Sequence, residues 1–275
     1  MSNTRHGVIL FIIIACVITG YFLLSPRETS HHQTIISEQS SPPLTEKSSS
    51  PKLSESEPLT RHPLPASVGK DNNSAEPLPP LADSDIAIQQ ALEKFGDAKQ
   101  LDQLFIFKNF IDHMVVTTDN LPRTKQPVQR LPTKSPSGKF MVRKSADGSL
   151  EIDPENYQRY TPYVRFIEGL DSQAVAKFYF RFYPLFQEAY TNLGYKSAYF
   201  NDRVIAVIDD LLATPDVSDP VKLIQPSVFY KYKDPRLESL SAGQRLLIRI
   251  GSDNSAKIKA KLRELRAAFT KPAPN

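Results

Sequence analysis

The sequence contains no tryptophan, one cysteine and five histidines. The cysteine, Cys16, lies inside an apolar segment, so disulfides within one chain and metal sites built from several thiolates are excluded. After residue 82 the only histidine is His113, on an apolar stretch typical of a core or boundary histidine. A zinc site with several histidines is therefore excluded after residue 82, and a Ser-His-Asp site could use only His113 as its base. We expect no catalytic residue, no metal site and no cofactor.

Aromatic residues are absent between Phe22 and Phe95, and nearly all of them lie from Phe95 to Phe269. Only this C-terminal part can bury a large core, which predicts one folded domain over residues 83–270, followed by a disordered tail at 271–275. Residues 83–275 hold 28 Lys and Arg against 23 Asp and Glu. This mildly basic balance fits an acidic partner or surface but not nucleic acid, which favours a dense basic patch.

An apolar run begins at Val8 and ends at Leu24. As a helix, these seventeen residues span about 26 Å, near the lower limit for a bilayer core. One alternative is a cleaved signal peptide, but the run lacks a small-residue cleavage site at its end. Another is a lipoprotein signal acylated at Cys16, although eight more residues of the run follow that cysteine. The sequence favours an uncleaved transmembrane helix that contacts the lipid bilayer through residues 8–24.

The charges around this run predict its orientation. Arg5, His6 and the free amino terminus precede it, whereas Arg27 and Glu28 follow. The positive-inside rule then places residues 1–7 in the cytoplasm. In a bacterium, this orientation predicts a single-pass inner-membrane protein with its C-terminal domain in the periplasm.

Residues 25–82 have a composition typical of a disordered linker. They contain twelve Ser and ten Pro among fifty-eight residues, and no aromatic residue. Such a segment cannot bury enough apolar surface to offset the entropy lost on ordering. As a flexible coil it reaches about 40 Å from the membrane. Three histidines in it, His31, His32 and His62, are interpreted as solvated residues rather than metal ligands.

The rest of the chain predicts a mainly α, compact multi-helix domain with a small antiparallel β-hairpin. Helical periodicity and capping residues recur along it. A strong turn signal, Asp147-Gly148, separates two short apolar runs and predicts the hairpin. Residues 222–232 are expected to be extended, and Pro226 keeps this segment short or peripheral. The expected helices cover residues 83–95, 100–116, 153–169, 171–193, 201–212, 237–250 and 253–269.

Aromatic and charged residues off the apolar stripes indicate a candidate binding surface. Residues 177–186 read KFYFRFYPLF, in which Phe178, Phe182 and Phe186 form a core stripe. Aromatic walls with a cation at the rim are suited to a glycan, a peptide or an aromatic ligand. The residues expected to form this surface are Phe180, Arg181, Tyr183, Tyr199, Asp202 and Arg203.

Two carboxylates offer the main alternative. Asp202 and Asp209 are two helical turns apart and therefore share one face of their helix, where a pair could perform acid/base catalysis. Ion pairing, for Asp209 with a nearby Arg or Lys, is the simpler interpretation. The leading hypothesis is a membrane-tethered envelope interaction module that binds an envelope protein or cell-wall partner. The rival hypothesis is a carboxylate-dependent hydrolase acting on an envelope polymer.

Several blocks resemble a known bacterial family. They are LPPLADSD (78–85), DNLPR (119–123), RFYPLFQEAYTNLGY (181–195), YFNDRVIAVIDDLLATP (199–215) and LSAGQRLLIRIGSDNSAKIKAKLRELR (240–266). Through these blocks the chain is similar to the family catalogued as domain of unknown function 3014. The resemblance covers residues 78–269 and implies a single-span envelope protein with a proline-rich spacer. It implies no activity, ligand or catalytic residue.

Overall fold

The computed structural model describes residues 61–64, 77–124 and 130–270. Most of this part is helical. Its helices are η4 (Leu81–Asp83), α2 (Asp85–Leu92), α3 (Ala98–Leu104), α4 (Phe110–Asn120), α5 (Glu155–Arg159), α6 (Thr161–Glu168), α7 (Ser172–Asn192), α8 (Phe200–Leu212), α9 (Pro235–Glu238), α10 (Ala242–Arg249) and α11 (Ser252–Thr270). Its strands are β1 (Val142–Lys144), β2 (Leu150–Ile152), β3 (Lys222–Ile224) and β4 (Lys231–Tyr232).

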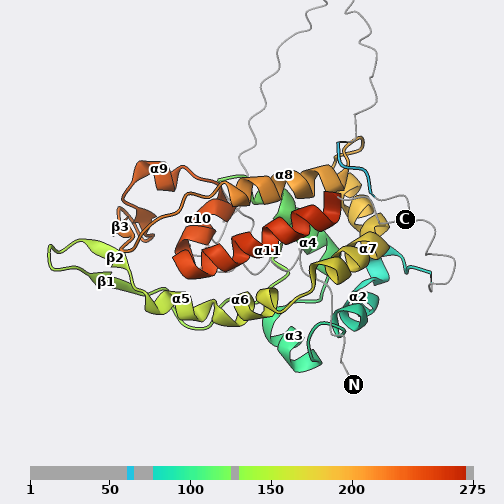
Figure 1. Cartoon of the computed structure of the whole chain (residues 1–275), viewed down its shortest axis with the longest axis horizontal. Coiled ribbons are helices and arrows are strands. Elements are labelled where there is room, and N and C mark those ends of the chain that lie inside the picture. The colour runs from blue at the N-terminus through green and yellow to red at the C-terminus, as the bar shows by residue number, and fades with distance from the viewer. Residues whose placement is uncertain (1–60, 65–76, 125–129, 271–275) are drawn as a thin grey trace, which may run out of the picture.

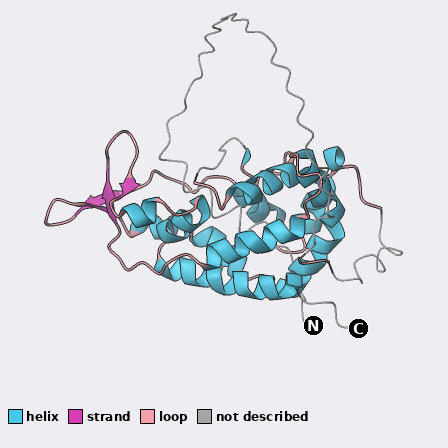
Figure 2. Ribbon diagram, turned by 90° about the horizontal axis from the view of Figure 1, so that it is seen from above, coloured by secondary structure: helices cyan, strands magenta, loops and turns pink. Residues whose placement is uncertain are grey.

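The helices form one body and the strands lie at one end of it. In Figure 1, α11 crosses the middle of the body, and it contacts α6, α7, α8 and α10. Figure 2 shows the strands projecting from the same end in the perpendicular view. The predicted fold class is therefore confirmed in its main features: a compact, mainly helical domain carries a small antiparallel sheet.

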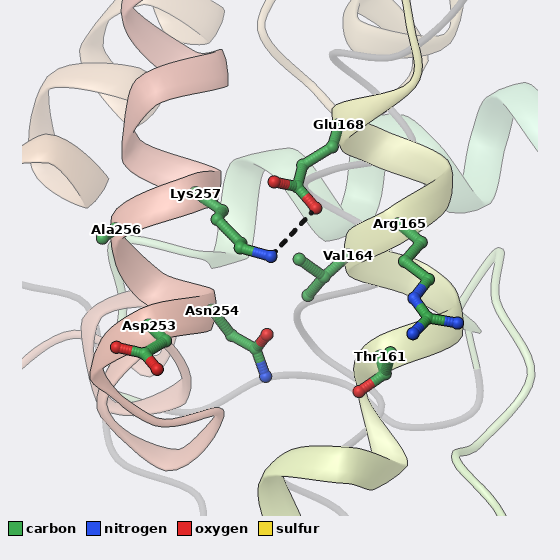
Figure 3. A pocket seen from close by; sticks show the side chains of 8 residues that line it. All are labelled: Thr161, Val164, Arg165, Glu168, Asp253, Asn254, Ala256 and Lys257. Carbon is green, nitrogen blue, oxygen red and sulfur yellow. Dashed lines mark hydrogen bonds and ion pairs between the residues drawn. The ribbon is translucent and has the colours of Figure 1, made fainter.

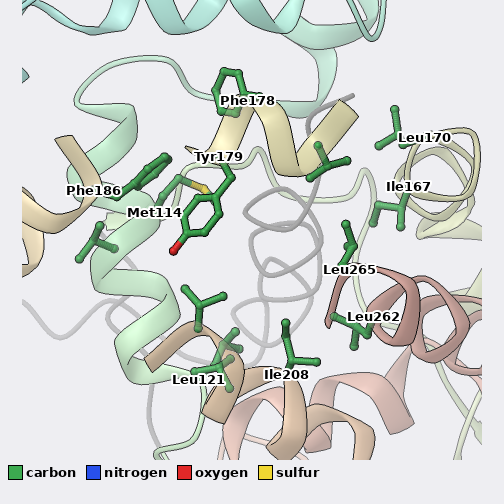
Figure 4. Close-up of a cluster of buried hydrophobic side chains, with 14 of the residues drawn as sticks. Met114, Leu121, Ile167, Leu170, Phe178, Tyr179, Phe186, Ile208, Leu262 and Leu265 are labelled. Atoms are coloured by element: carbon green, nitrogen blue, oxygen red, sulfur yellow. The ribbon is translucent and has the colours of Figure 1, made fainter. Parts of the chain in front are cut away.

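The core is built around α7. The apolar stripe predicted for this helix is buried from Val175 to Tyr190, and Asp171 caps the helix by accepting from the backbone N–H groups of Gln173 and Ala174. The ring of Tyr179 lies 5.8 Å from that of Phe186 and 4.8 Å from that of Phe269 on α11. Figure 4 shows aliphatic side chains from α6, α8 and α11 closing around it. Dense packing of this kind holds α7 and α8 in place, so that the faces turned away from the core can carry a site.

The sheet is larger than expected. The predicted hairpin forms as β1 and β2, but β3 and β4 extend it into four antiparallel strands in the order β1-β2-β3-β4. Leu223 pairs with Leu150 on one side and with Tyr232 on the other, and all three turn toward a second apolar cluster. A two-stranded hairpin is marginal in water, so the added strands stabilise it.

The helix predicted for residues 100–116 is wrong in its middle. α3 ends at Leu104 and α4 begins at Phe110, because Phe105 is extended and forms a bridge with Thr133. Asn109 adopts a left-handed conformation with φ of 52°. The Asp85 carboxylate accepts from the backbone N–H groups of Asn109 and Phe110 at 2.8 and 2.9 Å, which starts α4 anew. Similarly, α5 and α6 replace one predicted helix over residues 153–169.

Some predictions concern residues outside those described. The predicted span at 8–24, the tail at 271–275 and most of the linker at 25–82 are among them. In residues 61–64, 77–124 and 130–270, no helix is long and apolar enough to cross a bilayer.

Candidate functional site

The site lies where the loop after α7 turns into α8. Gln187 of α7 holds this turn: its Nε2 donates to the Ala198 carbonyl at 2.9 Å, and its Oε1 accepts from the Phe200 backbone N–H at 2.8 Å. The Tyr183 hydroxyl donates to the same Oε1 at 2.8 Å and accepts from the Asn201 N–H at 3.4 Å. Side chains of α7 thus supply partners for N–H groups that the start of a helix leaves unpaired.

A buried charge cluster fixes the other side of the turn. Asp119, at the end of α4, pairs with Arg203 on α8 at 3.0 Å and with Arg123 at 2.7 Å. The Tyr195 hydroxyl donates to the same carboxylate at 3.1 Å. The Asp119 side chain is 6% exposed, whereas that of Arg123 is 53% exposed. This cluster joins α4, the 193–199 loop and the first turn of α8.

Residues 61–64 of the linker lie against this turn. Figure 1 draws them as the short blue segment beside the start of α8. Asp202 accepts from two consecutive backbone N–H groups, from Arg61 at 3.1 Å and from His62 at 2.7 Å. Asn201, which is fully buried, donates its Nδ2 to the His62 carbonyl at 2.8 Å. The Tyr199 hydroxyl accepts from the Leu64 N–H at 3.2 Å.

All four hydrogen bonds join a side chain of the domain to the backbone of the linker. They come from three residues at the start of α8, Tyr199, Asn201 and Asp202. Their partners are main-chain groups of the linker and not its side chains. Leu64 adds a side-chain contact, because it packs against the main apolar cluster. We call this arrangement the linker groove. For residues 61–64 it replaces the predicted disorder with a docked segment, since the partners for its backbone are 135 to 141 residues away in sequence.

A hollow continues from the linker groove along α8. Its volume is about 410 Å³, and Tyr190, Ala206 and Asp209 line it together with Arg61, His62, Tyr199, Asp202 and Arg203. The volume falls in the range of small-ligand or short-peptide sites. The hollow therefore provides room for a ligand beyond the four linker residues.

Half of the predicted binding surface lies here. Tyr199, Asp202 and Arg203 all line the hollow. Tyr183 lies beneath them and is 6% exposed, so it supports the groove from inside instead of forming a surface; its ring centroid is 5.4 Å from that of Tyr199, and burial raises its pKa well above the ordinary value. Phe180 and Arg181 lie elsewhere, Phe180 against Phe269 and Arg181 over the ring of Phe182.

Three residues of the site were not predicted from the sequence. Asn201 and Gln187 are polar residues whose partners are distant or on another helix, and no local pattern marks them. Each of the three lies in a block that carries the family resemblance, Asp119 in 119–123, Gln187 in 181–195 and Asn201 in 199–215, and this was the one available signal.

A second hollow, of about 500 Å³, lies between α6 and α11 (Figure 3). Lys257 pairs there with Glu168 at 3.3 Å, and Asn254 donates to the carbonyls of Tyr157 and Ile250. Cations and carboxylates are mixed along its walls, and Asn254 is occupied in joining α11 to α5. This hollow has the character of a helix–helix seam, and the linker groove is the stronger candidate site.

The carboxylates named in the hydrolase hypothesis both hold other partners. Asp202 accepts the two linker N–H groups, and Asp209 forms an ion pair with Arg266, with oxygen–nitrogen distances of 2.6 and 3.1 Å. The predicted pairing of Asp209 with a basic residue is therefore confirmed. Within the described ranges, no group of three His, Cys, Asp or Glu side chains is placed to hold a metal ion.

His113 on α4 makes the free energy of unfolding depend on pH. Burial is the main cause that lowers the pKa of His113 below 6.5; Arg130 lowers it further, whereas Asp112 and Asp85 oppose the shift. Among the described residues its Nδ1 has no hydrogen-bond partner. Because the pKa is lower in the folded state, the unfolded chain takes up this proton at a higher pH than the folded chain does. The neutral imidazole is therefore linked to a stabilisation of the folded state. This stabilisation is present above pH 6.5 and is lost as the pH falls through the folded-state pKa.

We expect the free energy of unfolding to fall as the pH is lowered from 7.5 to 5.5, and the His113→Gln variant to lose less over the same interval. The difference between the two slopes is below about 1.4 kcal/mol per pH unit, the limit for one proton. Urea unfolding at several pH values measures it. Equal slopes for the variant and the wild type would contradict the assignment.

Comparison with known proteins addresses the family of the chain. The model of the family described as protein of unknown function (DUF3014) matches residues 110–266, which is more than half of the sequence. This range includes Asp119, Gln187 and the whole start of α8. No curated protein and no solved structure matches the chain. The resemblance found in the sequence blocks is confirmed over this range, and the chain belongs to the DUF3014 family.

Proposed function

We propose that this chain is a membrane-tethered interaction module of the bacterial envelope, and that its linker groove binds a short segment of polypeptide through its backbone. The observation that carries the proposal is the set of four hydrogen bonds from Tyr199, Asn201 and Asp202 to backbone groups of residues 61–64. Side chains that satisfy main-chain N–H and C=O groups are suited to segments of varied sequence, because every residue except proline offers both groups.

The charge and rigidity of the groove support this function. Asp202 lies in the first turn of α8, where the helix dipole stabilises a carboxylate before any ligand arrives. The Gln187 and Asp119 contacts hold the turn from both sides. A pre-formed site loses little conformational entropy when it binds.

The sequence supplies the cellular context of the proposal. The apolar run at 8–24 would anchor the chain in the inner membrane with residues 1–7 in the cytoplasm. The domain would then lie in the periplasm, at the end of a long linker, where its partner is an envelope protein. A C-terminal reporter that is active only outside the cytoplasm tests this orientation, and a cytoplasmic signal would contradict it.

In-cell photo-crosslinking tests the binding function. Ala206 is exposed and lines the hollow beside the groove, whereas Ala146 is exposed on the hairpin and serves as the matched control. A crosslinking residue at position 206 is expected to capture one recurrent segment of another envelope protein, identified by mass spectrometry. Capture should disappear in the Asp202→Ala variant and be absent at position 146. Crosslinks only to the chain's own residues would contradict the proposal.

A further inference from the structure

We infer that the ligand class of the linker groove is a short proline–leucine segment, and that residues 61–64 occupy the groove as an intrachain competitor that a partner must displace. This inference rests on the proposed function and adds the kind of partner and its regulation. It follows from the hydrogen bonds, from the leucine contact and from the sequence of the linker.

The hydrogen-bond pattern has one position without a donor. Arg61, His62 and Leu64 each donate their backbone N–H to the groove. The remaining residue of the segment, Pro63, has no N–H to donate. Proline therefore costs no hydrogen bond at this position. At any of the other three positions, proline would remove a donor.

The residue after this proline provides the apolar contact. Leu64 is half-buried and packs against the main apolar cluster, while Arg61 and Pro63 are exposed. The groove thus distinguishes a proline followed by an aliphatic residue from the surrounding polar sequence.

The linker repeats this dipeptide. Within residues 25–82 there are six leucines, and five of them follow a proline, at positions 44, 59, 64, 78 and 81. Three of these five lie in the described residues. All three, Leu64, Leu78 and Leu81, pack against the same apolar cluster. The one leucine that does not follow a proline is Leu53. Every leucine of residues 25–82 that the structure describes therefore follows a proline and contacts the domain.

Tethering gives the intrachain segment an advantage over a free one. Twelve residues, 65–76, connect the docked segment to residue 77. A connection of this length produces an effective concentration on the order of millimolar. A partner segment must compete with the docked segment at that concentration. Its apparent affinity is the intrinsic affinity multiplied by the fraction of domains whose groove is open, so it is low when few grooves are open. Docking at residues 61–64 also leaves only residues 25–60 to span the distance from the predicted anchor.

Peptide binding to the full chain in detergent tests the inference. The probe is a fluorescent peptide of residues 58–67, PLTRHPLPAS, followed by anisotropy. We expect the Leu64→Ser chain to bind it about tenfold more tightly than the wild type does, because the competitor has been weakened. The Leu53→Ser chain is the matched control and should bind like the wild type. Asp202→Ala added to Leu64→Ser should abolish binding, as should Leu64→Ser within the peptide.

Circular dichroism and urea unfolding of each variant show that the domain remains folded. Equal affinities for the wild-type and Leu64→Ser chains would overturn the competitor role. Failure of the peptide to bind the Leu64→Ser chain would overturn the ligand class, and the proposed function would still stand if crosslinking at position 206 captures an envelope segment. Conversely, tight peptide binding without such capture would support the inference while the proposed function fails.

Discussion

The Asp119→Ala variant is expected to lose about 3 kcal/mol of unfolding free energy. The substitution removes a buried carboxylate and leaves Arg203, whose side chain is 26% exposed, without its ion-pair partner. Removing one member of a buried pair costs about 3–5 kcal/mol, and the exposure of Arg123 and part of Arg203 places the loss at the lower end. The Tyr195 hydroxyl also loses its acceptor on α4. Urea unfolding of the full chain, followed by circular dichroism, measures the change.

An exposed ion pair provides the control. Glu168 pairs with Lys257 at 3.3 Å, and their side chains are 38% and 49% exposed. Glu168→Ala should therefore change the free energy of unfolding by less than about 0.5 kcal/mol. If Asp119→Ala were no more destabilising than Glu168→Ala, the cluster would not hold the groove in place.

The Gly251→Ala variant is expected to lose about 3–4 kcal/mol. Gly251 joins α10 to α11 with φ of +90°, a conformation that costs an alanine about 1–2 kcal/mol. The new methyl group would also lie 2.6–2.9 Å from ring atoms of Tyr157, and overpacking of this kind costs about 1–3 kcal/mol more. The ring cannot move away easily, because the Tyr157 hydroxyl donates to Asp219 at 2.5 Å.

Gly148 separates the two causes. It has φ of +80° in the hairpin turn, but a methyl group there meets nothing within 4 Å. Gly148→Ala should show the conformational cost alone, about 1–2 kcal/mol. In a Tyr157→Ala background, the additional cost of Gly251→Ala should fall to the same value. An unchanged cost in that background would mean that the overlap with Tyr157 is unimportant.

Local patterns predicted the helices well where one apolar stripe dominates. α7, α8 and α11 each carry such a stripe, and each forms close to its predicted bounds. The break between α3 and α4 was not predictable in the same way, because it depends on Asp85 in another helix and on a bridge to Thr133. The sheet was underestimated for a similar reason, since β2 and β3 are joined across about seventy residues of sequence.

The site shows the same limit. Tyr199, Asp202 and Arg203 lie on one helix start, so their proximity followed from helical spacing. Tyr183 was assigned to the surface because it lies off the apolar stripe of α7, yet the ring of Tyr199 and the N–H of Asn201 cover it. The occupant of the groove was not predicted, because a proline- and serine-rich composition indicates disorder and carries no sign that four of its residues find partners on α8.

Hydrogen exchange at the backbone N–H groups of Arg61, His62 and Leu64 in the full chain tests the linker groove most directly. Each N–H donates to a side chain of the domain, so exchange should be at least about tenfold slower than in an unstructured peptide of the same sequence. In the Asp202→Ala variant the N–H groups of Arg61 and His62 should exchange at the unstructured rate, while those in the middle of α8 stay protected. Unstructured rates at all three positions in the wild-type chain would contradict the account.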